Sequence, residues 1–155
     1  MRTEDDKYKV ERIVLIEFAK NASLNLDQES MRKGNPDIGE PDIFCNCNAK
    51  FIYFELAEAC VKEFAAAIAE AKRNESGLAT AWGSDGIEEV LNKKLKKSYN
   101  VKEPIDLLLY LNGRNALPDD VLIPKALHLL KNGAGPFRKV WFFGETVCEL
   151  DTGNS

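Results

Sequence analysis

The sequence predicts a single α/β domain with a mixed central sheet flanked by helices, and three observations support this. The chain has 155 residues, an ordinary size for one domain. Hydrophobic residues make up 45% of it, which is enough for a core. Amphipathic helical segments alternate with short apolar runs that are typical of strands. We therefore expect one domain over residues 1–155, with a core at about 8–145 and a polar tail at 151–155.

The first half of the chain predicts a helix, a hairpin and a second helix. Residues 5–22 carry apolar side chains at helical spacing. Residues 43–47 and 50–56 are rich in strand-forming residues, and their short connection favours an antiparallel hairpin. The alanine-rich segment 57–73 then indicates a helix.

The second half predicts two helices and further strands. Asp85 and Glu88 form a capping-box pattern at the start of one helix. Pro124 is expected to open a second, short helix that ends near Gly133. Strands are expected at residues 105–111, 139–143 and 146–150. The first of these is almost wholly apolar, which is typical of a strand buried on both faces.

Charge and hydropathy exclude several classes of protein. The chain has 21 basic and 25 acidic residues, a net charge of −4, which argues against a protein that coats nucleic acid. The amino-terminal residues are polar and lack the apolar core of a secretory signal. The longest apolar runs are too short to span a bilayer. We therefore expect a cytoplasmic protein that does not contact membranes.

The cysteines do not form a recognisable metal motif. Cys45 and Cys47 are separated by one residue, and Cys60 and Cys148 lie far from them. A zinc site needs about four ligands, and the chain has one histidine, His128. Buried free thiols are therefore expected rather than a zinc site or a disulfide framework.

Three acidic residues stand where apolar residues would be expected. Glu17 falls within the apolar stripe of the first helix, Asp42 follows a proline at the start of a strand, and Glu55 lies inside an apolar strand. A buried carboxylate is costly unless it is paired or binds a cation. If the three converge, their oxygens suit Mg²⁺ or Mn²⁺. Such an ion can activate water and offset charge on a phosphate.

Each acid also has a simpler interpretation. Glu17 could pair with a lysine or arginine at the edge of the core. Glu55 could face solvent on a half-covered strand, and alternation would then expose Phe51 and Tyr53 as well. Asp42 could cap a turn after the proline.

The spacing of these acids resembles a known superfamily. The motif Gly-Glu-Pro-Asp-Ile at residues 39–43, with Glu55 thirteen residues after Asp42, resembles the PD-(D/E)xK nucleases. The order of elements is compatible over roughly residues 8–112. The resemblance implies a restriction endonuclease-like core of helix, three-strand meander, helix and strand. It also implies Asp42 and Glu55 as catalytic metal ligands, Glu17 as the first-helix acid, Mg²⁺ or Mn²⁺ as cofactor, DNA as partner, and a homodimer as one possible assembly.

The chain departs from this superfamily at one position. Ala57 stands where the superfamily has a lysine that orients or deprotonates the attacking water. Some members carry that lysine on a nearby helix, and Lys62 is the candidate here. Lys50 is a second candidate at the far end of its strand, and Glu58 could supply another ligand.

Basic residues suggest where nucleic acid could bind. Lys93, Lys94, Lys96 and Lys97 lie on one predicted helix, where they could contact a phosphate backbone or simply form a solvated face. Arg114 follows a buried strand at its carboxyl end, where α/β proteins often place ligands.

Three functional hypotheses remain at this point. The first is a metal-dependent nuclease that hydrolyses DNA phosphodiester bonds. The alternative is a catalytically inactive nuclease-fold module that binds nucleic acid or a protein partner, which the missing lysine favours. The third is an unrelated α/β interaction module, in which the three acids would lie far apart.

Overall fold

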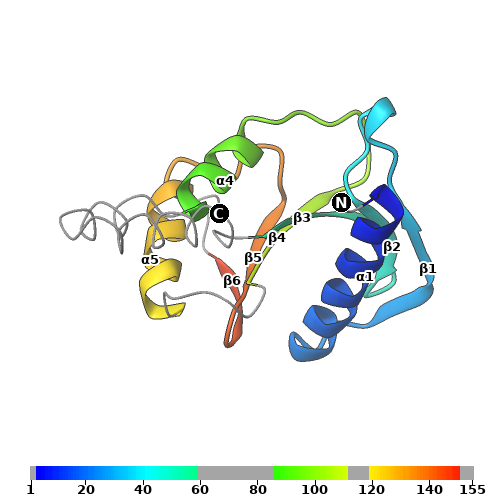
Figure 1. The fold of residues 1–155 in the computed structure, drawn as a ribbon, viewed down its shortest axis with the longest axis horizontal. Coiled ribbons are helices and arrows are strands. Elements are labelled where there is room, and N and C mark those ends of the chain that lie inside the picture. The colour runs from blue at the N-terminus through cyan, green and yellow to red at the C-terminus, as the bar shows by residue number, and fades with distance from the viewer. Residues whose placement is uncertain (1–2, 59–85, 112–118, 151–155) are drawn as a thin grey trace.

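The computed structural model describes residues 3–58, 86–111 and 119–150. Its elements are, in chain order, α1 (Glu4–Asn21), β1 (Leu26–Lys33), the short 3-10 helix η1 (Pro36–Ile38), β2 (Ile43–Cys47), β3 (Lys50–Glu58), α4 (Gly86–Leu95), β4 (Ile105–Tyr110), α5 (Asp119–Leu130), β5 (Lys139–Phe143) and β6 (Val147–Leu150). Figure 1 shows α1 on one side of the sheet and α4 with α5 on the other. The predicted mixed sheet flanked by helices is confirmed.

The strands form one sheet in the order β1-β2-β3-β4-β5-β6. β1, β2 and β3 form an antiparallel meander, β3, β4 and β5 run parallel, and β6 returns antiparallel to β5. The predicted hairpin of β2 and β3 is confirmed. Its turn residues, Asn48 and Ala49, have φ values of 53° and 64°, the left-handed backbone that two-residue hairpin turns require.

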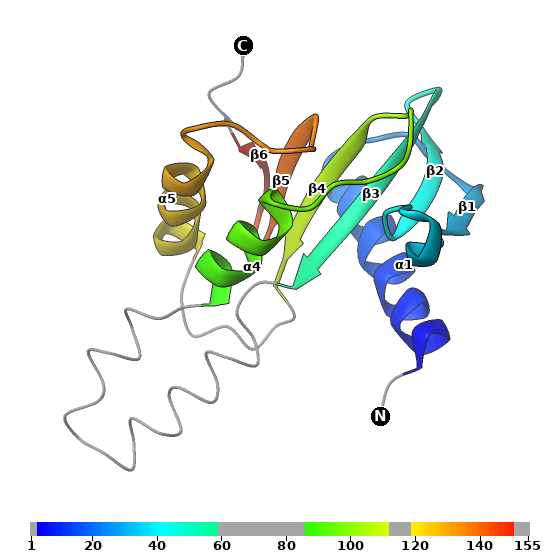
Figure 2. The same cartoon turned by 90° about the horizontal axis from the view of Figure 1, so that it is seen from above.

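Side-chain alternation divides the core into two layers. Ile43, Phe54 and Leu108 pack with Leu15 and Phe18 beneath α1. The opposite face packs against α4 and α5, with a core that includes Ile87, Leu91, Leu107, Leu109 and Leu122. β4 contributes to both layers and all six of its residues are buried, as its apolar sequence predicts. Figure 2 shows α1 beside β1 and β2, and α4 with α5 beside the later strands.

The helix α1 presents a different face to the core from the one predicted. Leu15 and Phe18 are fully buried, and Glu11 is 5% exposed. Ile13 is 61% exposed, and Glu17, which was expected within the apolar stripe, is also exposed. The prediction that Glu17 faces the core is therefore wrong. Residues 11, 15 and 18 lie at helical spacing from one another and define the face that packs on the sheet.

Two elements differ from their predicted positions. α5 begins at Asp119, and Pro124 lies inside it, so the predicted start of this helix at Pro124 is wrong. The strand β1 was not placed by the sequence, because its residues LDQESMRK lack the apolar alternation of a strand. It forms an edge of the sheet, where polar residues are tolerated, and its pairing with β2 is interrupted between Asp27 and Arg32.

Some predictions fall outside the described residues. These are residues 59–73 of the helix expected from the alanine-rich segment, and the cap residue Asp85. The predicted start of that helix at Ala57 is wrong, because Ala57 and Glu58 belong to β3. Cys45 and Cys47 are buried free thiols, as predicted, whereas Cys60 is not described. Within the described part of the chain, no helix is long and apolar enough to cross a membrane.

Candidate active site

Asp42, directly before β2, and Glu55, on β3, lie side by side and hold each other in place. The main-chain N–H of Asp42 donates a hydrogen bond to Glu55 Oε1 at 3.1 Å. The main-chain N–H of Leu56 donates to Asp42 Oδ2 at 2.9 Å. This follows from the β2–β3 register, which pairs Ile43 with Phe54 and so brings the preceding and following residues together. The two predicted acids therefore converge, and Glu55 is 2% exposed.

Two lysines of the α4 region approach Glu55. Glu55 points away from α1, because its neighbours Phe54 and Leu56 pack beneath that helix. Lys94 donates a hydrogen bond from Nζ to Glu55 Oε2 at 2.6 Å. Lys97 Nζ lies 3.3 Å from the same oxygen. Hydrogen bonds between two ionised groups are short and strong, so Glu55 is firmly fixed.

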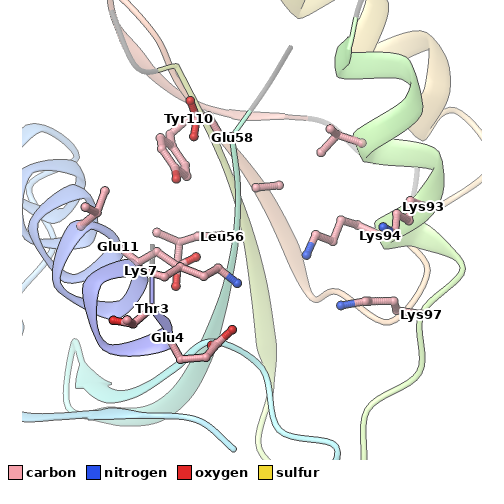
Figure 3. Close-up of a pocket in the computed structure, with 13 residues that line it drawn as sticks. Thr3, Glu4, Lys7, Glu11, Leu56, Glu58, Lys93, Lys94, Lys97 and Tyr110 are labelled. Carbon is pink, nitrogen blue, oxygen red and sulfur yellow. The ribbon is translucent and has the colours of Figure 1, made fainter. Parts of the chain in front are cut away.

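The helix α1 contributes an acid and a base to the same place. Lys7 and Glu11 lie one helical turn apart, so both project from the same side of the helix. Lys7 Nζ lies 3.8 Å from Asp42 Oδ1. A cavity of about 400 Å³ separates these residues from α4. In Figure 3, Lys7 and Lys94 extend toward each other from opposite sides of this cavity.

A second, smaller cavity of about 160 Å³ reaches the acids themselves. Asp42, Glu55 and Tyr99 line it. Glu11 and Lys94 line both cavities, so the two spaces adjoin one another. A ligand in the larger cavity would therefore contact Glu11 and Lys94, whereas Asp42 and Glu55 line the smaller of the two.

The protein environment drives the pKa values of the three acids apart. Burial, assisted by the negative charge of Asp42, raises the pKa of Glu11 to about 8. Burial and the charge of Glu55 also raise the pKa of Asp42. Burial opposes ionisation of Glu55 too, but the charge of Lys94 and its hydrogen bond prevail and lower the pKa of Glu55. Glu55 is thus ionised at neutral pH while Glu11 holds a proton, and such separated pairs are typical of acid–base sites.

Tyr99 closes the site beside Glu55. Its hydroxyl group is buried and makes no hydrogen bond of regular geometry within the described residues. Burial raises the pKa of Tyr99, and the charge of Glu55 raises it further. The tyrosine is therefore neutral and keeps solvent from one side of the carboxylate.

The chemical type of the donors fits a hard divalent ion, but their present arrangement does not form a complete coordination shell. Glu11, Asp42 and Glu55 supply carboxylate oxygens, which Mg²⁺ and Mn²⁺ prefer. Within the described ranges, however, no group of three histidine, cysteine or acidic side chains is placed to hold a metal ion. The lysine ammonium groups on Glu55 Oε2 occupy the direction that a cation would need. A metal could bind at Glu55 only if it displaced at least one of them.

Of the other residues that the sequence predicted for the site, some line the cavities, some are exposed elsewhere, and some are not described. Lys93 lines the larger cavity, whereas Lys96 is exposed. Glu17 lies on the exposed side of α1, so it is not at this site, and Glu11 supplies the helix acid instead. Lys62 and Arg114 lie outside the described residues.

The structure also describes Ala57, which stands where the superfamily has a lysine, and the two other residues considered with it, Glu58 and Lys50. Ala57 and Glu58 line the larger cavity. Lys50 stands at the opposite end of β3. Lys94 of α4 lines the same cavity as Ala57, the position at which the resemblance implies a lysine. The sequence had suggested Lys94 as a phosphate contact or as part of a solvated helix face.

Sequence reasoning missed three residues of the site, namely Lys7, Glu11 and Tyr99. The signal for Glu11 was its spacing of four and seven residues from Leu15 and Phe18, which marks one helix face. No local pattern distinguishes Tyr99, because its contact with Glu55 depends on how the chain returns from α4 to β4.

Comparison with protein-family models, curated proteins and solved structures gives no match for this chain. Its function is therefore inferred from side-chain geometry.

Proposed function

We propose that this protein is a metal-dependent nuclease that hydrolyses phosphodiester bonds of DNA. One observation carries the proposal. Two carboxylates, the partly buried Asp42 at the start of β2 and the buried Glu55 on β3, are fixed beside each other, with Lys94 Nζ 2.6 Å from Glu55. Metal-dependent hydrolysis of a phosphodiester uses acids that bind the cation and is assisted by a positive group near the attacking water.

The order of elements supports the resemblance to the PD-(D/E)xK superfamily. α1 is followed by the meander β1-β2-β3, and β4 lies parallel to β3 after the helix α4. The resemblance implies a helix, a three-strand meander, a helix and a strand. It also implies the two acids at the positions that Asp42 and Glu55 occupy.

Lys94 is well placed to replace the lysine that Ala57 lacks. It reaches Glu55 from the facing helix, and its side chain is 18% exposed. Its ammonium group can orient a water molecule or steady negative charge on a phosphate bound in the larger cavity. Lys7, on the opposite wall, can contact the same phosphate.

Asp42, Glu55 and Glu11 are the residues that would hold the metal. A bound Mg²⁺ or Mn²⁺ would supply Lewis-acid stabilisation of the phosphate and a lower pKa for bound water. Glu11 would lose its proton when the cation binds, because a nearby positive charge favours the ionised carboxylate. Lys97, which is more exposed than Lys94 and farther from Glu55, is the lysine expected to move away.

A cleavage assay tests the proposal. Fluorescent single-stranded and duplex DNA, and matched RNA, are incubated with the protein in Mg²⁺, in Mn²⁺ and in EDTA. Asp42→Asn and Glu55→Gln should each lower the metal-dependent rate by about 100-fold or more. Glu149→Gln serves as a control, because this glutamate lies on β6 and pairs with Lys139. Retained cleavage in a variant with both substitutions would overturn the proposal.

A second candidate function is a catalytically inactive module of the same fold that binds nucleic acid or a protein partner. The pairing of Lys94 and Lys97 with one oxygen of Glu55 favours it, because these ion pairs satisfy the acid without a metal. Calorimetric titration with Mn²⁺ separates the two functions. Absence of metal binding and of cleavage, together with measurable binding of nucleic acid, would support the inactive module.

A further inference from the structure

An open stack of flat side chains lies on the β1-β2-β3 meander. The rings of Phe44 on β2 and Phe51 on β3 are parallel within 5°, with their centroids 5.5 Å apart. The guanidinium carbon of Arg32 on β1 lies 4.7 Å from the centroid of Phe44. Because β2 lies between β1 and β3 in the sheet, Phe44 is on the strand between those that carry Arg32 and Phe51. Phe51, the outer member, is 55% exposed.

The inner end of this stack is fixed by polar contacts. Arg32 donates from Nη1 and Nη2 to the two carboxylate oxygens of Glu40, each at 3.3 Å. The hydroxyl of Tyr53 donates to Glu40 Oε2 at 2.8 Å. The hydrogen bond with Arg32, followed by that from the Asn35 main chain, lowers the pKa of Glu40 to about 2. The guanidinium is therefore held in place at neutral pH, and the stack exists before any ligand arrives.

The exposed ring of Phe51 points to a ligand that is itself flat. A single exposed apolar residue is common on protein surfaces. Here, however, the exposed ring belongs to a preformed stack, which a further planar group would extend. A flat, unpaired group therefore matches this exposed end of the stack.

We propose that Phe51 is a stacking site for an unpaired base of single-stranded nucleic acid. This inference rests on the proposed function for the class of ligand. Bases stack on aromatic side chains whatever their sequence, and only an unpaired or terminal base has a free face. Phe51, Tyr53 and Glu55 alternate on one face of β3, so the stacked base would lie about 14 Å along the strand from Glu55.

A protein partner fits this surface less well. A specific protein interface covers about 800 Å² on each partner. The exposed large hydrophobic residues of the described chain are Ile13, Ile38, Phe51 and Val121, and they lie on four different elements. Phe51 is the one such residue on the described β2–β3 hairpin.

The test measures binding without catalysis. Fluorescence anisotropy follows a labelled oligothymidylate, and a duplex of equal length, in EDTA. Phe51→Ala should weaken binding of the single strand about 5- to 100-fold and leave duplex binding almost unchanged. Phe51→Trp should retain the affinity, whereas Phe51→Leu, which keeps apolar area but has no ring, should lose it. Ile13→Ala is the control, because it removes an equally exposed apolar residue from α1.

The outcomes separate this inference from the nuclease proposal. Unchanged binding by Phe51→Ala, no binding of single strands by the native protein, or full rescue by leucine would each overturn the stacking site. Circular dichroism of each variant checks that it is folded. The Glu149→Gln variant in EDTA should bind the oligothymidylate like the native protein. If acid substitutions fail to affect cleavage but Phe51→Ala weakens binding, only the nuclease proposal is lost.

Discussion

Lys94 of α4 and Glu55 of β3 form a largely buried ion pair, with Lys94 Nζ 2.6 Å from Glu55 Oε2. The two residues are 39 positions apart in the chain, and the side chains are 18% and 3% exposed. Loss of one partner of a buried pair leaves the other charge without compensation. This pair therefore links the stability of the fold to the chemistry of the candidate active site.

Replacement of Lys94 should affect both properties. We expect Lys94→Met to abolish metal-dependent cleavage. It should also lower the free energy of unfolding by about 2 kcal/mol, because Glu55 loses its nearest positive partner. The loss is limited to this size because Lys97 still approaches Glu55. Urea denaturation at pH 7 measures the stability. Lys93→Met, which alters an exposed neighbour on the same helix, should leave stability within about 0.5 kcal/mol of the native value. Equal stability of the two variants would contradict the importance of the ion pair.

The coupling between Lys94 and Glu55 can be measured directly. In a double-mutant cycle with Lys94→Met and Glu55→Gln, the combined variant should be more stable than the sum of the two single effects predicts, by about 1 to 3 kcal/mol. The reason is that removal of both charges leaves neither one buried alone. Strictly additive effects would show that the pair contributes nothing as a unit.

Glu11 should make stability depend on pH. Its pKa in the folded protein is about 8, above its ordinary value, so the folded state holds a proton that the unfolded state has lost. Its contribution to stability is therefore complete below the ordinary pKa of glutamate and is lost as the pH rises toward about 8. Each pH unit within that window costs at most about 1.4 kcal/mol.

Two variants on α1 isolate this effect. Glu11→Gln cannot ionise, so its free energy of unfolding should fall less steeply between pH 5 and pH 8 than that of the native protein. Glu17→Gln changes an exposed glutamate on the same helix and should keep the native slope. Urea denaturation at several pH values measures both. Identical slopes for Glu11→Gln and the native protein would rule out the buried proton.

Metal binding should release the proton of Glu11. We expect the affinity for Mn²⁺ to increase as the pH rises from 6 to 8, because the cation binds the ionised carboxylate. Calorimetry in two buffers with different heats of ionisation counts the released protons. Glu11→Gln should remove the pH dependence, and Asp42→Asn should remove the binding. Affinity that is independent of pH would place Glu11 outside the metal site.

Asp106 is an acid for which we expect a structural role, and its contribution to stability can be measured. It is 1% exposed on β4 and accepts hydrogen bonds from Arg138 at 3.0 Å and from Trp141 at 3.1 Å. We expect Asp106→Asn to lower the free energy of unfolding by about 2 to 3 kcal/mol, because the arginine loses its charged partner and is partly exposed to water. Thermal and urea denaturation measure this loss. A change below about 0.5 kcal/mol would contradict the role.

Several features of the fold are determined by local sequence. The β2–β3 hairpin was predicted because two runs of strand-forming residues flank a short turn, and β4 was predicted because its residues are almost wholly apolar. The convergence of Asp42 and Glu55 was also predictable, since the hairpin brings these positions together. In each case the pattern depends on residues close in the chain.

The tertiary structure decided the rest. Glu55 and Asp106 are both acids within apolar strands, and no local pattern separates them. Only packing gives Asp106 an arginine from the residue that precedes β5 and Glu55 a lysine from a helix. Likewise, Glu11 rather than Glu17 lies at the site because of the orientation of α1 about its own axis, which turns Glu11 toward the sheet and Glu17 toward solvent. A sequence records the spacing of side chains along one element, whereas these contacts depend on distances between elements that fold together only in three dimensions.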